Sequence, residues 1–286
     1  MKKKVVLMVN DKDACNIACK KCYLPFQGVK SAEDTIRDVE TLHSLGFDVT
    51  IAGSETLMDT NYLDAYQKAG QDYILTNGLL LLQNSKYFGL LKEHGINTLQ
   101  ISADFGVQSD MSSVPLTLVE RVVKLAVERD FQVRLTTLIT EKNYQDVLSM
   151  CKQAYEMGAQ EIRFLRYLEL GSGANHPEFS LDKEQILQFF DLVQETRSIY
   201  SQEELNIKIH GNFGPRQGSK GEDLSLQNSY CPAGESLFVI TPNNKIYGCP
   251  FLIKDQELGH FTNGELKLDR ELDHSRANCL TYSLEV

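Results

Sequence analysis

The sequence lacks any long apolar run, and this absence argues against a membrane-spanning helix. Its longest apolar stretch, GLLLL at 78–82, is far shorter than the roughly 20 residues that a bilayer requires. The first residues, MKKKVVLMV, place five apolar residues after three lysines but run into polar sequence without a small-residue cleavage site. We therefore expect a cytoplasmic protein with no membrane partner.

Basic residues are also scarce relative to acidic ones. Lys and Arg total 29 against 39 Asp and Glu, which gives a formal net charge of -10. Nonspecific nucleic-acid binders need a cation-rich surface, so we expect no nucleic-acid partner. Apolar residues make up 42% of the 286 residues and charged residues 24%, which is ordinary for a globular protein with a sizeable core.

Cysteine occurs in an odd number, seven, and in uneven clusters. That distribution suits metal ligation better than a disulfide framework, which uses cysteines in pairs. Cys15, Cys19 and Cys22 lie within eight positions of one another. Structural zinc sites usually close with four ligands, whereas three thiolates on a cubic iron–sulfur cluster leave one iron open to another ligand. The spacing favours the cluster, with a zinc site or an incidental group of cysteines as the alternatives.

The first two-thirds of the chain alternate between short apolar strands and amphipathic helices. The predicted strands are 5–9, 48–53, 72–77, 98–103, 132–139 and 161–168. The predicted helices between them include 31–46, 84–95, 115–130 and 144–158. Each strand–helix unit takes about 25–35 residues, the size of a βα repeat, so the fold class is α/β with a parallel sheet curled into an open barrel. The cysteines follow the first strand, and loops at the carboxyl ends of parallel strands line the site in such folds.

The alternation of strands and helices ends toward the C-terminus. A further predicted helix at 181–201 leads into a glycine-rich stretch, and SLFVITPNNKIYG at 236–248 then alternates around an Asn-Asn pair. Asn tolerates the positive φ of a tight turn, so this stretch predicts a β-hairpin. We expect one domain over 1–200 and a second, smaller one over 201–286.

The motifs along the chain resemble those of the radical S-adenosylmethionine (radical SAM) superfamily. Cys-x3-Cys-x2-Cys after a first strand is the signature of that superfamily, and four further motifs follow in order at the ends of later predicted strands. The resemblance implies a partial (βα)6 barrel whose three cysteines hold a [4Fe–4S] cluster that binds S-adenosylmethionine (SAM). The cofactor-binding residues that it implies are Gly53, Ser54, Glu55, Thr76, Asn77, Ser102, Asp104 and Asn143.

The sequence departs from the superfamily pattern at the cysteine motif and at the glycine motif. Lys21 stands before the third cysteine, where an aromatic residue usually packs near the adenine. Either Tyr23 takes over that contact or the adenine sits differently. The glycine motif lacks its second glycine and its proline. Arg166 is the expected partner of the SAM carboxylate, although structural ion pairs are equally open to Arg134, Arg163 and Arg166.

A second set of cysteines lies near the C-terminus. Cys231, Cys249 and Cys279, with the predicted hairpin between the first two, resemble the SPASM and twitch extensions of the superfamily. The resemblance implies a twitch-like domain with one auxiliary [4Fe–4S] cluster. Its fourth ligand is open, with His210, His260 and His274 as the nearest side-chain candidates. A zinc site and a degenerate domain without metal are the alternatives. Cys151 falls in a helical apolar pattern and is predicted to pack in the core rather than to donate a hydrogen atom.

The resemblance also implies a function. It predicts an enzyme that reductively cleaves SAM and abstracts a hydrogen atom from its substrate, with a flavodoxin- or ferredoxin-type electron donor. We expect a ribosomal peptide as the substrate, modified by crosslinking, thioether formation, epimerisation or oxidation. A small-molecule dehydrogenase or cyclase is one alternative, and a non-catalytic iron–sulfur or zinc protein is another.

Overall fold

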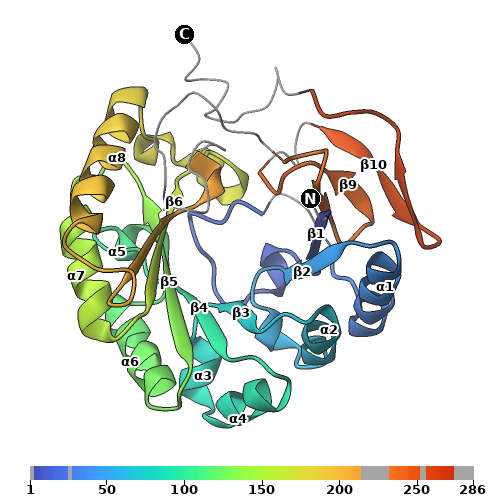
Figure 1. Ribbon diagram of the computed structural model, residues 1–286, viewed down its shortest axis with the longest axis horizontal. Coiled ribbons are helices and arrows are strands. Elements are labelled where there is room, and N and C mark those ends of the chain that lie inside the picture. Colours follow the sequence, from blue (N-terminus) through green and yellow to red (C-terminus); the bar gives the residue numbers. More distant parts are fainter. Residues whose placement is uncertain (1–2, 25–27, 214–231, 252–255, 274–286) are drawn as a thin grey trace.

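The computed structural model describes residues 3–24, 28–213, 232–251 and 256–273, and their strands form two sheets (Figure 1). One sheet has the order β3-β4-β5-β6-β7 and is parallel throughout. Its strands are β3 (Tyr73–Thr76), β4 (Thr98–Ser102), β5 (Gln132–Ile139), β6 (Glu161–Arg166) and β7 (Asn206–Ile209). The other has the order β11-β10-β9-β8-β1-β2. Its strands are β1 (Lys4–Met8), β2 (Asp48–Ala52), β8 (Leu237–Ile240), β9 (Lys245–Tyr247), β10 (Glu257–Thr262) and β11 (Glu265–Leu268).

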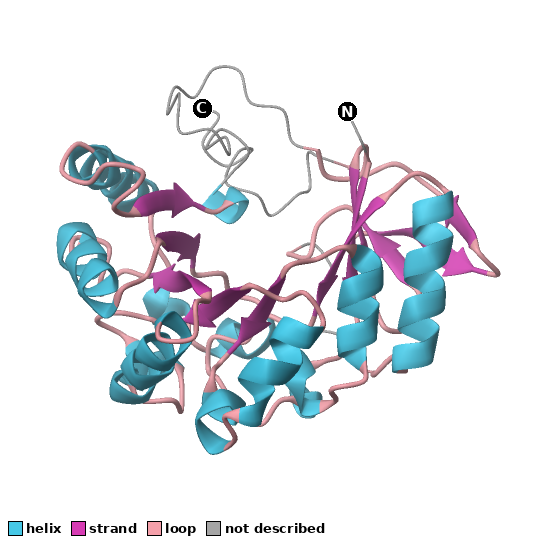
Figure 2. Cartoon of the chain, turned by 60° about the horizontal axis from the view of Figure 1, so that its bottom comes forward, coloured by secondary structure: helices cyan, strands magenta, loops and turns pink. Residues whose placement is uncertain are grey.

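The helices lie on the outside of the arc that the strands make, as Figures 1 and 2 show. They are α1 (Ala32–Ser44), α2 (Tyr62–Ala69), α3 (Leu79–Gln83), α4 (Lys86–Glu93), α5 (Gln108–Met111), α6 (Leu116–Val127), α7 (Val147–Met157) and α8 (Lys183–Arg197). The predicted βα alternation is therefore confirmed, and the strand bounds agree with the sequence prediction to within two residues. The result is an open α/β half-barrel.

The two faces of the curved sheet differ in polarity. Apolar side chains such as Leu99, Leu135 and Phe164 are buried against the helices. Their neighbours along the strands point to the opposite, inner face, because successive side chains of a strand alternate. There the cross-strand partners are polar, as with Arg134 and Glu161. The helices cover the apolar outer face of the sheet, while the inner face stays available for polar contacts.

The expected single barrel sheet is interrupted between β2 and β3. The side-chain amide of Gln71 occupies the free edge of β2, accepting from Ile51 N at 2.7 Å and donating to Ile51 O at 3.2 Å. It also donates to Tyr73 O at 3.0 Å. One buried glutamine thus satisfies the backbone groups that a neighbouring strand would otherwise pair, and the strands form two sheets instead of one.

The C-terminal strands continue the sheet of β1. The predicted hairpin is present as β8 and β9, and Asn244 has the positive φ of 64° that the tight turn needs. β8 pairs in parallel with β1, and β10 and β11 extend the sheet in antiparallel fashion. β7 follows the expected domain boundary at residue 200 yet pairs with β6. The division at that residue stays a prediction.

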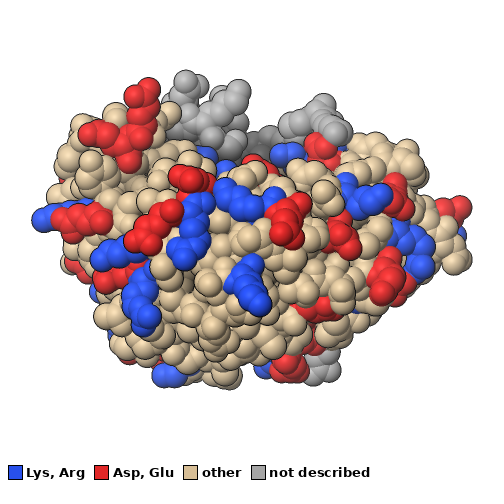
Figure 3. Space-filling model, turned by 90° about the horizontal axis from the view of Figure 1, so that it is seen from below, with Lys and Arg blue, Asp and Glu red and all other residues tan. Residues whose placement is uncertain are grey.

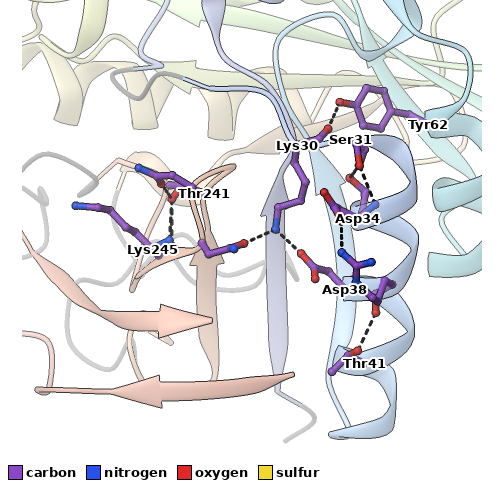
Figure 4. A network of polar contacts seen from close by, with 12 residues as sticks. Lys30, Ser31, Asp34, Asp38, Thr41, Tyr62, Thr241 and Lys245 are labelled. Atoms are coloured by element: carbon purple, nitrogen blue, oxygen red, sulfur yellow. Dashed lines mark hydrogen bonds and ion pairs between the residues drawn. The ribbon is translucent and has the colours of Figure 1, made fainter. Parts of the chain in front are cut away.

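A buried lysine ties the hairpin to the barrel (Figure 4). The Lys30 ammonium pairs with the Asp38 carboxylate on α1 and donates to Asn244 Oδ1 at 2.6 Å. The Tyr62 hydroxyl on α2 donates to the Lys30 carbonyl, and Ser31 caps α1 by accepting from Asp34 N at 3.0 Å. Because both partners of the Lys30 ion pair are largely buried, its loss would leave an unpaired charge inside the protein. The contact joins α1 and the segment before it to the turn between β8 and β9.

Two observations bear on the surface. No helix in the part of the chain that the structure describes is both long and apolar enough to cross a membrane. On the face shown in Figure 3, lysine and arginine side chains lie among aspartate and glutamate side chains, and neither sign of charge dominates the view.

Candidate functional site

The cysteine loop, residues 11–24, follows β1 and extends across the middle of the arc (Figure 1). Asp11 starts it by capping a short 3₁₀ turn, where its side chain accepts from Asp13 N at 2.9 Å. The same carboxylate accepts from Gly28 N at 2.5 Å, which closes the base of the loop. Cys15, Cys19 and Cys22 are all half-buried and unbridged. The loop is held at three places by residues from the ends of other strands.

The first place is the Cys15 end, which the residue after β3 holds. Asn77 Nδ2 donates to Asn16 Oδ1 at 2.7 Å and lies 4.0 Å from Cys15 Sγ. Asn77 N in turn donates to Glu55 Oε2 at 2.7 Å. A chain of polar contacts therefore runs from the end of β2 through the end of β3 to the first cysteine.

The second place is the turn from Cys19 to Cys22, which lies against the connection between β4 and α6. Lys20 N donates to Met111 O at 3.1 Å, and Cys19 Sγ lies 3.8 Å from Ser112 Oγ. The Lys21 ammonium pairs with the Asp104 carboxylate. The lysine that replaces the usual aromatic residue is thus turned toward the end of β4.

The third place is Cys22 itself, which the loop after β6 holds. Its carbonyl accepts from Ser172 N at 2.7 Å. The preceding Gly171 has a φ of +56°, and a Cβ atom there would lie 2.4 Å from Cys22 O. Only glycine allows the two backbones to approach this closely. The ends of β3, β4 and β6 together position all three cysteines.

The chemistry of the three thiols fits an iron–sulfur cluster. Burial raises the pKa values of Cys15 and Cys22, and the neighbouring cysteines raise them further. Among the described residues no group of three or more His, Cys, Asp or Glu side chains converges on one metal-ion position. Three thiolates are the donor set of an iron–sulfur cluster with one open iron, so such a cluster stays the predicted occupant of this loop.

Glu55 is buried at the end of β2, with 1% of its surface exposed. Both of its carboxylate oxygens lie 3.0 Å from the Thr76 hydroxyl, and Oε2 also accepts from Asn77 N. Burial raises its pKa from the ordinary 4.5 to about 7, although these hydrogen bonds lower it. The carboxylate thus links two strand ends, and a role in holding the SAM amino group stays a prediction.

Gly53 and Ser54 are held by the side chain of Asn10, the second residue after β1. Asn10 Oδ1 accepts from Ser54 N at 2.7 Å and lies 3.2 Å from Ser54 Oγ. A Cβ atom on Gly53 would lie 2.1 Å from Asn10 Oδ1. The glycine is therefore required for the close packing of an amide against this strand end.

Asp104 and Asn143 are also engaged by the chain itself. Asp104 is fully buried, and its Oδ1 accepts from Leu138 N at 3.1 Å. Asn143 Nδ2 donates to Phe105 O at 2.8 Å and to Leu138 O at 2.9 Å. Its Oδ1 accepts from Thr140 N at 2.8 Å. These side chains fix the geometry of the strand ends; their predicted contacts to SAM, and that of Ser102, stay predictions.

The three arginines considered for the SAM carboxylate have different surroundings. Arg163 pairs with Glu161 at 2.6 Å, and the Arg134 guanidinium lies 5.6 Å from the Tyr73 ring centroid. Arg166 ends β6, and its backbone N and O both contact the Asn212 side chain, at 3.1 and 2.9 Å. Arg163 therefore has a structural role, and the ligand role of Arg166 stays a prediction.

An aromatic contact connects the cysteine loop to the C-terminal part of the chain. The Tyr23 ring packs against Phe251 at 5.2 Å between centroids, and Phe251 packs edge-on against His210 at 5.9 Å. Burial raises the pKa of Tyr23, as do the nearby Cys22 and Cys249. Tyr23 thus lies between the two cysteine regions. Whether it also reaches the adenine stays a prediction.

The C-terminal cysteines are only partly described. Cys249 is half-buried, whereas Cys231, Cys279 and His274 lie outside the described residues. His210 Nδ1 accepts from Asn212 N at 3.1 Å, and burial together with Arg163 lowers its pKa to about 4. His260 is on β10 beside Glu257, 3.2 Å away. The auxiliary cluster and its ligands therefore stay predictions.

Cys151 is fully buried on α7, which confirms the expected core position. Burial raises the pKa of this thiol to about 12.

Several residues that shape the site were not predicted from the sequence. They are Asn10, Asn16, Ser112, Gly171, Ser172 and Phe251. Asn10 had a recognisable signal, because it is a polar residue that ends the first apolar strand. Gly171 lies in a Gly-Ser-Gly turn after the sixth predicted strand. Ser112 and Phe251 had no recognisable signal in the sequence, because only the folded chain brings them to the cysteine loop.

Comparison with known proteins gives distant relatives by sequence. No protein-family model matches the chain. A GTP 3',8-cyclase of Synechocystis sp. is 26% identical over 191 residues, which cover 60% of this chain and 57% of that protein. A GTP 3',8-cyclase of Aquifex aeolicus is 24% identical, and the match covers 91% of this chain and 86% of that one. The chain spans little more than half of the first relative and most of the second.

Solved structures share the fold over most of the chain. Streptococcus suis SuiB bound to the precursor peptide SuiA has a TM-score of 0.70 at 16% identity, and the match covers 99% of this chain and 66% of SuiB. The protein anSMEcpe with bound AdoMet has a TM-score of 0.67 at 17% identity, covering 91% of this chain and 78% of that one. SuiB has also been solved with SAM bound. Similarity in sequence to the cyclases, together with the fold shared with two proteins that have been solved with SAM, supports the resemblance to the radical SAM superfamily.

Proposed function

We propose that this protein is a radical SAM enzyme that reductively cleaves SAM and abstracts a hydrogen atom from its substrate. The observation that supports this most directly is the cysteine loop, whose three free thiols are clamped by the ends of three parallel strands. A [4Fe–4S] cluster held by Cys15, Cys19 and Cys22 would supply one electron to the SAM sulfonium, whose carbon–sulfur bond breaks to give methionine and a 5′-deoxyadenosyl radical.

The chain's own residues would orient the reactants and exclude water. The strand ends at Gly53 and Ser54, stiffened by Asn10, would offer backbone groups to the methionine part of SAM. Ser102 ends β4, and its cross-strand partner is Thr136 on the inner face. Such fixed polar groups cost no reorganisation when the reactants bind, and enclosure protects a radical from side reactions.

The substrate that we propose is a peptide. SuiB, whose fold matches 99% of this chain, has been solved with a precursor peptide, and anSMEcpe has been solved with peptides as well. The support for this proposal is that two proteins of this fold have been solved with peptides bound.

A small nucleotide is the second candidate, and a separate observation favours it. The sequence relatives are GTP 3',8-cyclases, one of which aligns with 91% of this chain. The two candidates differ in size and charge, so they can be tested side by side.

The test begins with anaerobic reconstitution of the whole chain with iron and sulfide. Reduction in the presence of SAM should release 5′-deoxyadenosine, measured by liquid chromatography and mass spectrometry, and Cys19→Ala should abolish this release. Assembly of a cluster without any release of 5′-deoxyadenosine would favour the non-catalytic alternative. GTP and candidate short peptides are then added in parallel, and faster release with one of them identifies the substrate class.

A further inference from the structure

We propose that Lys21 is the positioning residue of the cysteine loop. Its ion pair with Asp104 holds the turn from Cys19 to Cys22 against the end of β4 and thereby sets the affinity for SAM. The inference about affinity rests on the proposed function. The inference about the position of the loop concerns the chain alone and is tested separately.

Asp104 is a rigid anchor for this pair. Its side chain is fully buried, and that of Lys21 is 16% exposed. The second carboxylate oxygen, Oδ1, accepts from Leu138 N on β5 at 3.1 Å. Asp104 N donates to Gln108 Oε1 at 2.6 Å, and Gln108 Nε2 donates to Val114 O at 2.6 Å. The carboxylate of Asp104 is therefore tied to β5 and its backbone N to the connection after β4, so Lys21 pairs with a residue that is held from two sides.

Lys21 makes the strongest of the three contacts on this turn. Lys20 N donates a neutral hydrogen bond to Met111 O at 3.1 Å, and the Cys19 thiol lies 3.8 Å from Ser112 Oγ. Losing a neutral hydrogen bond costs less stability than breaking a buried ion pair from one side. The cost is larger because the remaining Asp104 charge would stay buried without its cation.

The neighbouring lysine shows that charge alone does not explain the arrangement. Lys20 stands between the same two cysteines but is exposed, and among the described residues it forms no ion pair. Lys21 is turned inward and Lys20 outward. The chain therefore uses a polar clamp at the position where the superfamily usually has a packed aromatic ring.

The position of the loop is tested first on the chain without a cluster. Amide hydrogen exchange is measured by mass spectrometry on peptides that cover 15–24 in wild type, Lys21→Met and the matched control Lys20→Met. We expect amide exchange in this segment to be at least about tenfold faster in Lys21→Met than in wild type, which corresponds to a loss of about 1.4 kcal/mol of local stability. Exchange in the rest of the chain should be unchanged. Lys20→Met, which removes the same charge, should match wild type.

SAM affinity is then measured on the reconstituted proteins by equilibrium dialysis. We expect binding to be about tenfold weaker in Lys21→Met and within about twofold of wild type in Lys20→Met. Lys21→Arg keeps the charge and should recover most of the loss. A double-mutant cycle with Asp104→Asn tests the mechanism, because Lys21→Met should have little further effect once its partner is neutral.

The outcomes separate this inference from the proposed function. Equal hydrogen exchange and equal SAM affinity in Lys21→Met and Lys20→Met would overturn the inference about Lys21. Additive effects of Lys21→Met and Asp104→Asn in the double-mutant cycle would overturn it as well. Faster loop exchange in Lys21→Met, combined with a wild type that does not bind SAM, supports the clamp and contradicts the proposed function. If Lys21→Met does not fold, as judged by circular dichroism, Lys21→Gln takes its place against the same control and the same criteria.

Discussion

The two cysteine regions of this protein are built in different ways. In the first, residues from the ends of β3, β4 and β6 hold a short loop that carries all three cysteines. In the second, Cys249 is the second residue after β9, and the other two cysteines, Cys231 and Cys279, are 18 and 30 residues away in the sequence. The first region therefore depends on the strand ends of the half-barrel, whereas the predicted second site would need cysteines that are far apart in the sequence to meet. The difference predicts that a cluster forms at the first site even when the second site is disrupted.

Replacing one cysteine in each region tests this most strongly. Cys19→Ala should reduce 5′-deoxyadenosine release to background, because an [4Fe–4S] cluster at this loop has three protein thiolates and none to spare. Cys249→Ala should leave that cluster in place and remove only the auxiliary one. Iron and sulfide analysis should then fall from about eight irons per chain to about four in each variant. Four irons in wild type, unchanged by Cys249→Ala, would contradict the auxiliary cluster.

Gly171→Ala tests whether the backbone contact at Cys22 is needed. The added Cβ would lie 2.4 Å from Cys22 O at a φ of +56°, so either the loop or the turn after β6 must move. We expect a loss of about 4 kcal/mol in local stability, from strain and overpacking together, and a much lower yield of reconstituted cluster.

Gly70→Ala is the matched control for this substitution. Gly70 also has a positive φ, +66°, but a Cβ there meets no atom within 4 Å. It should cost only about 1 kcal/mol in urea unfolding and leave the iron content unchanged. Equal iron content in the two variants would show that the approach of Gly171 to Cys22 does not position the loop.

Much of the first region could be predicted from the sequence, because its signals are local. Strand periodicity located the strands, and parallel topology then placed Cys15, Glu55, Asn77 and Asp104 at one edge of the half-barrel. The sequence could not reveal how these polar groups pair. Glu55 contacts Thr76, and Asp104 contacts Lys21, yet the same residues in the same order would also allow both carboxylates to face a ligand.

Long-range pairings explain the other gaps. The parallel pairing of β8 with β1 joins residues more than 200 positions apart, and no local pattern indicates it. Gln71 breaks the sheet between β2 and β3 through its side chain, a role that strand periodicity does not report. The hairpin around Asn244 was predicted because its turn chemistry is local, but its partner strand was not.

The pH dependence of stability should also differ between the two regions. Glu55 has its pKa raised from 4.5 to about 7 by burial, so the folded state binds this proton more tightly than the unfolded state does. Its contribution to stability is complete below about pH 4.5 and is lost as the pH rises to about 7, a change of about 3 kcal/mol. Glu55→Gln cannot ionise. Relative to wild type, this variant should therefore be about 3 kcal/mol more stable at pH 8 than at pH 5.

Urea unfolding of the cluster-free chain at the two pH values measures this difference. Glu257→Gln is the control in the C-terminal part of the chain, where Glu257 on β10 forms a partly exposed ion pair with Lys245 at 2.6 Å. Exposed pairs contribute little, so this variant should change stability by less than about 1 kcal/mol at both pH values. A wild-type profile that matches Glu55→Gln at both pH values would show that Glu55 titrates normally.

The contact between Tyr23 and Phe251 carries the smallest expected effect, and it connects the two regions directly. Aromatic pairs at this separation, 5.2 Å between centroids, contribute about 0.5–1.5 kcal/mol beyond their burial. Tyr23→Leu and Phe251→Leu should each lower the stability of the cluster-free chain, and the double variant should show a coupling of about 1 kcal/mol. SAM affinity separates the two roles open to Tyr23. If the ring only bridges the regions, both single variants should change SAM affinity equally little, because each removes the same contact. A loss of SAM affinity confined to Tyr23→Leu would instead support the predicted contact with the adenine.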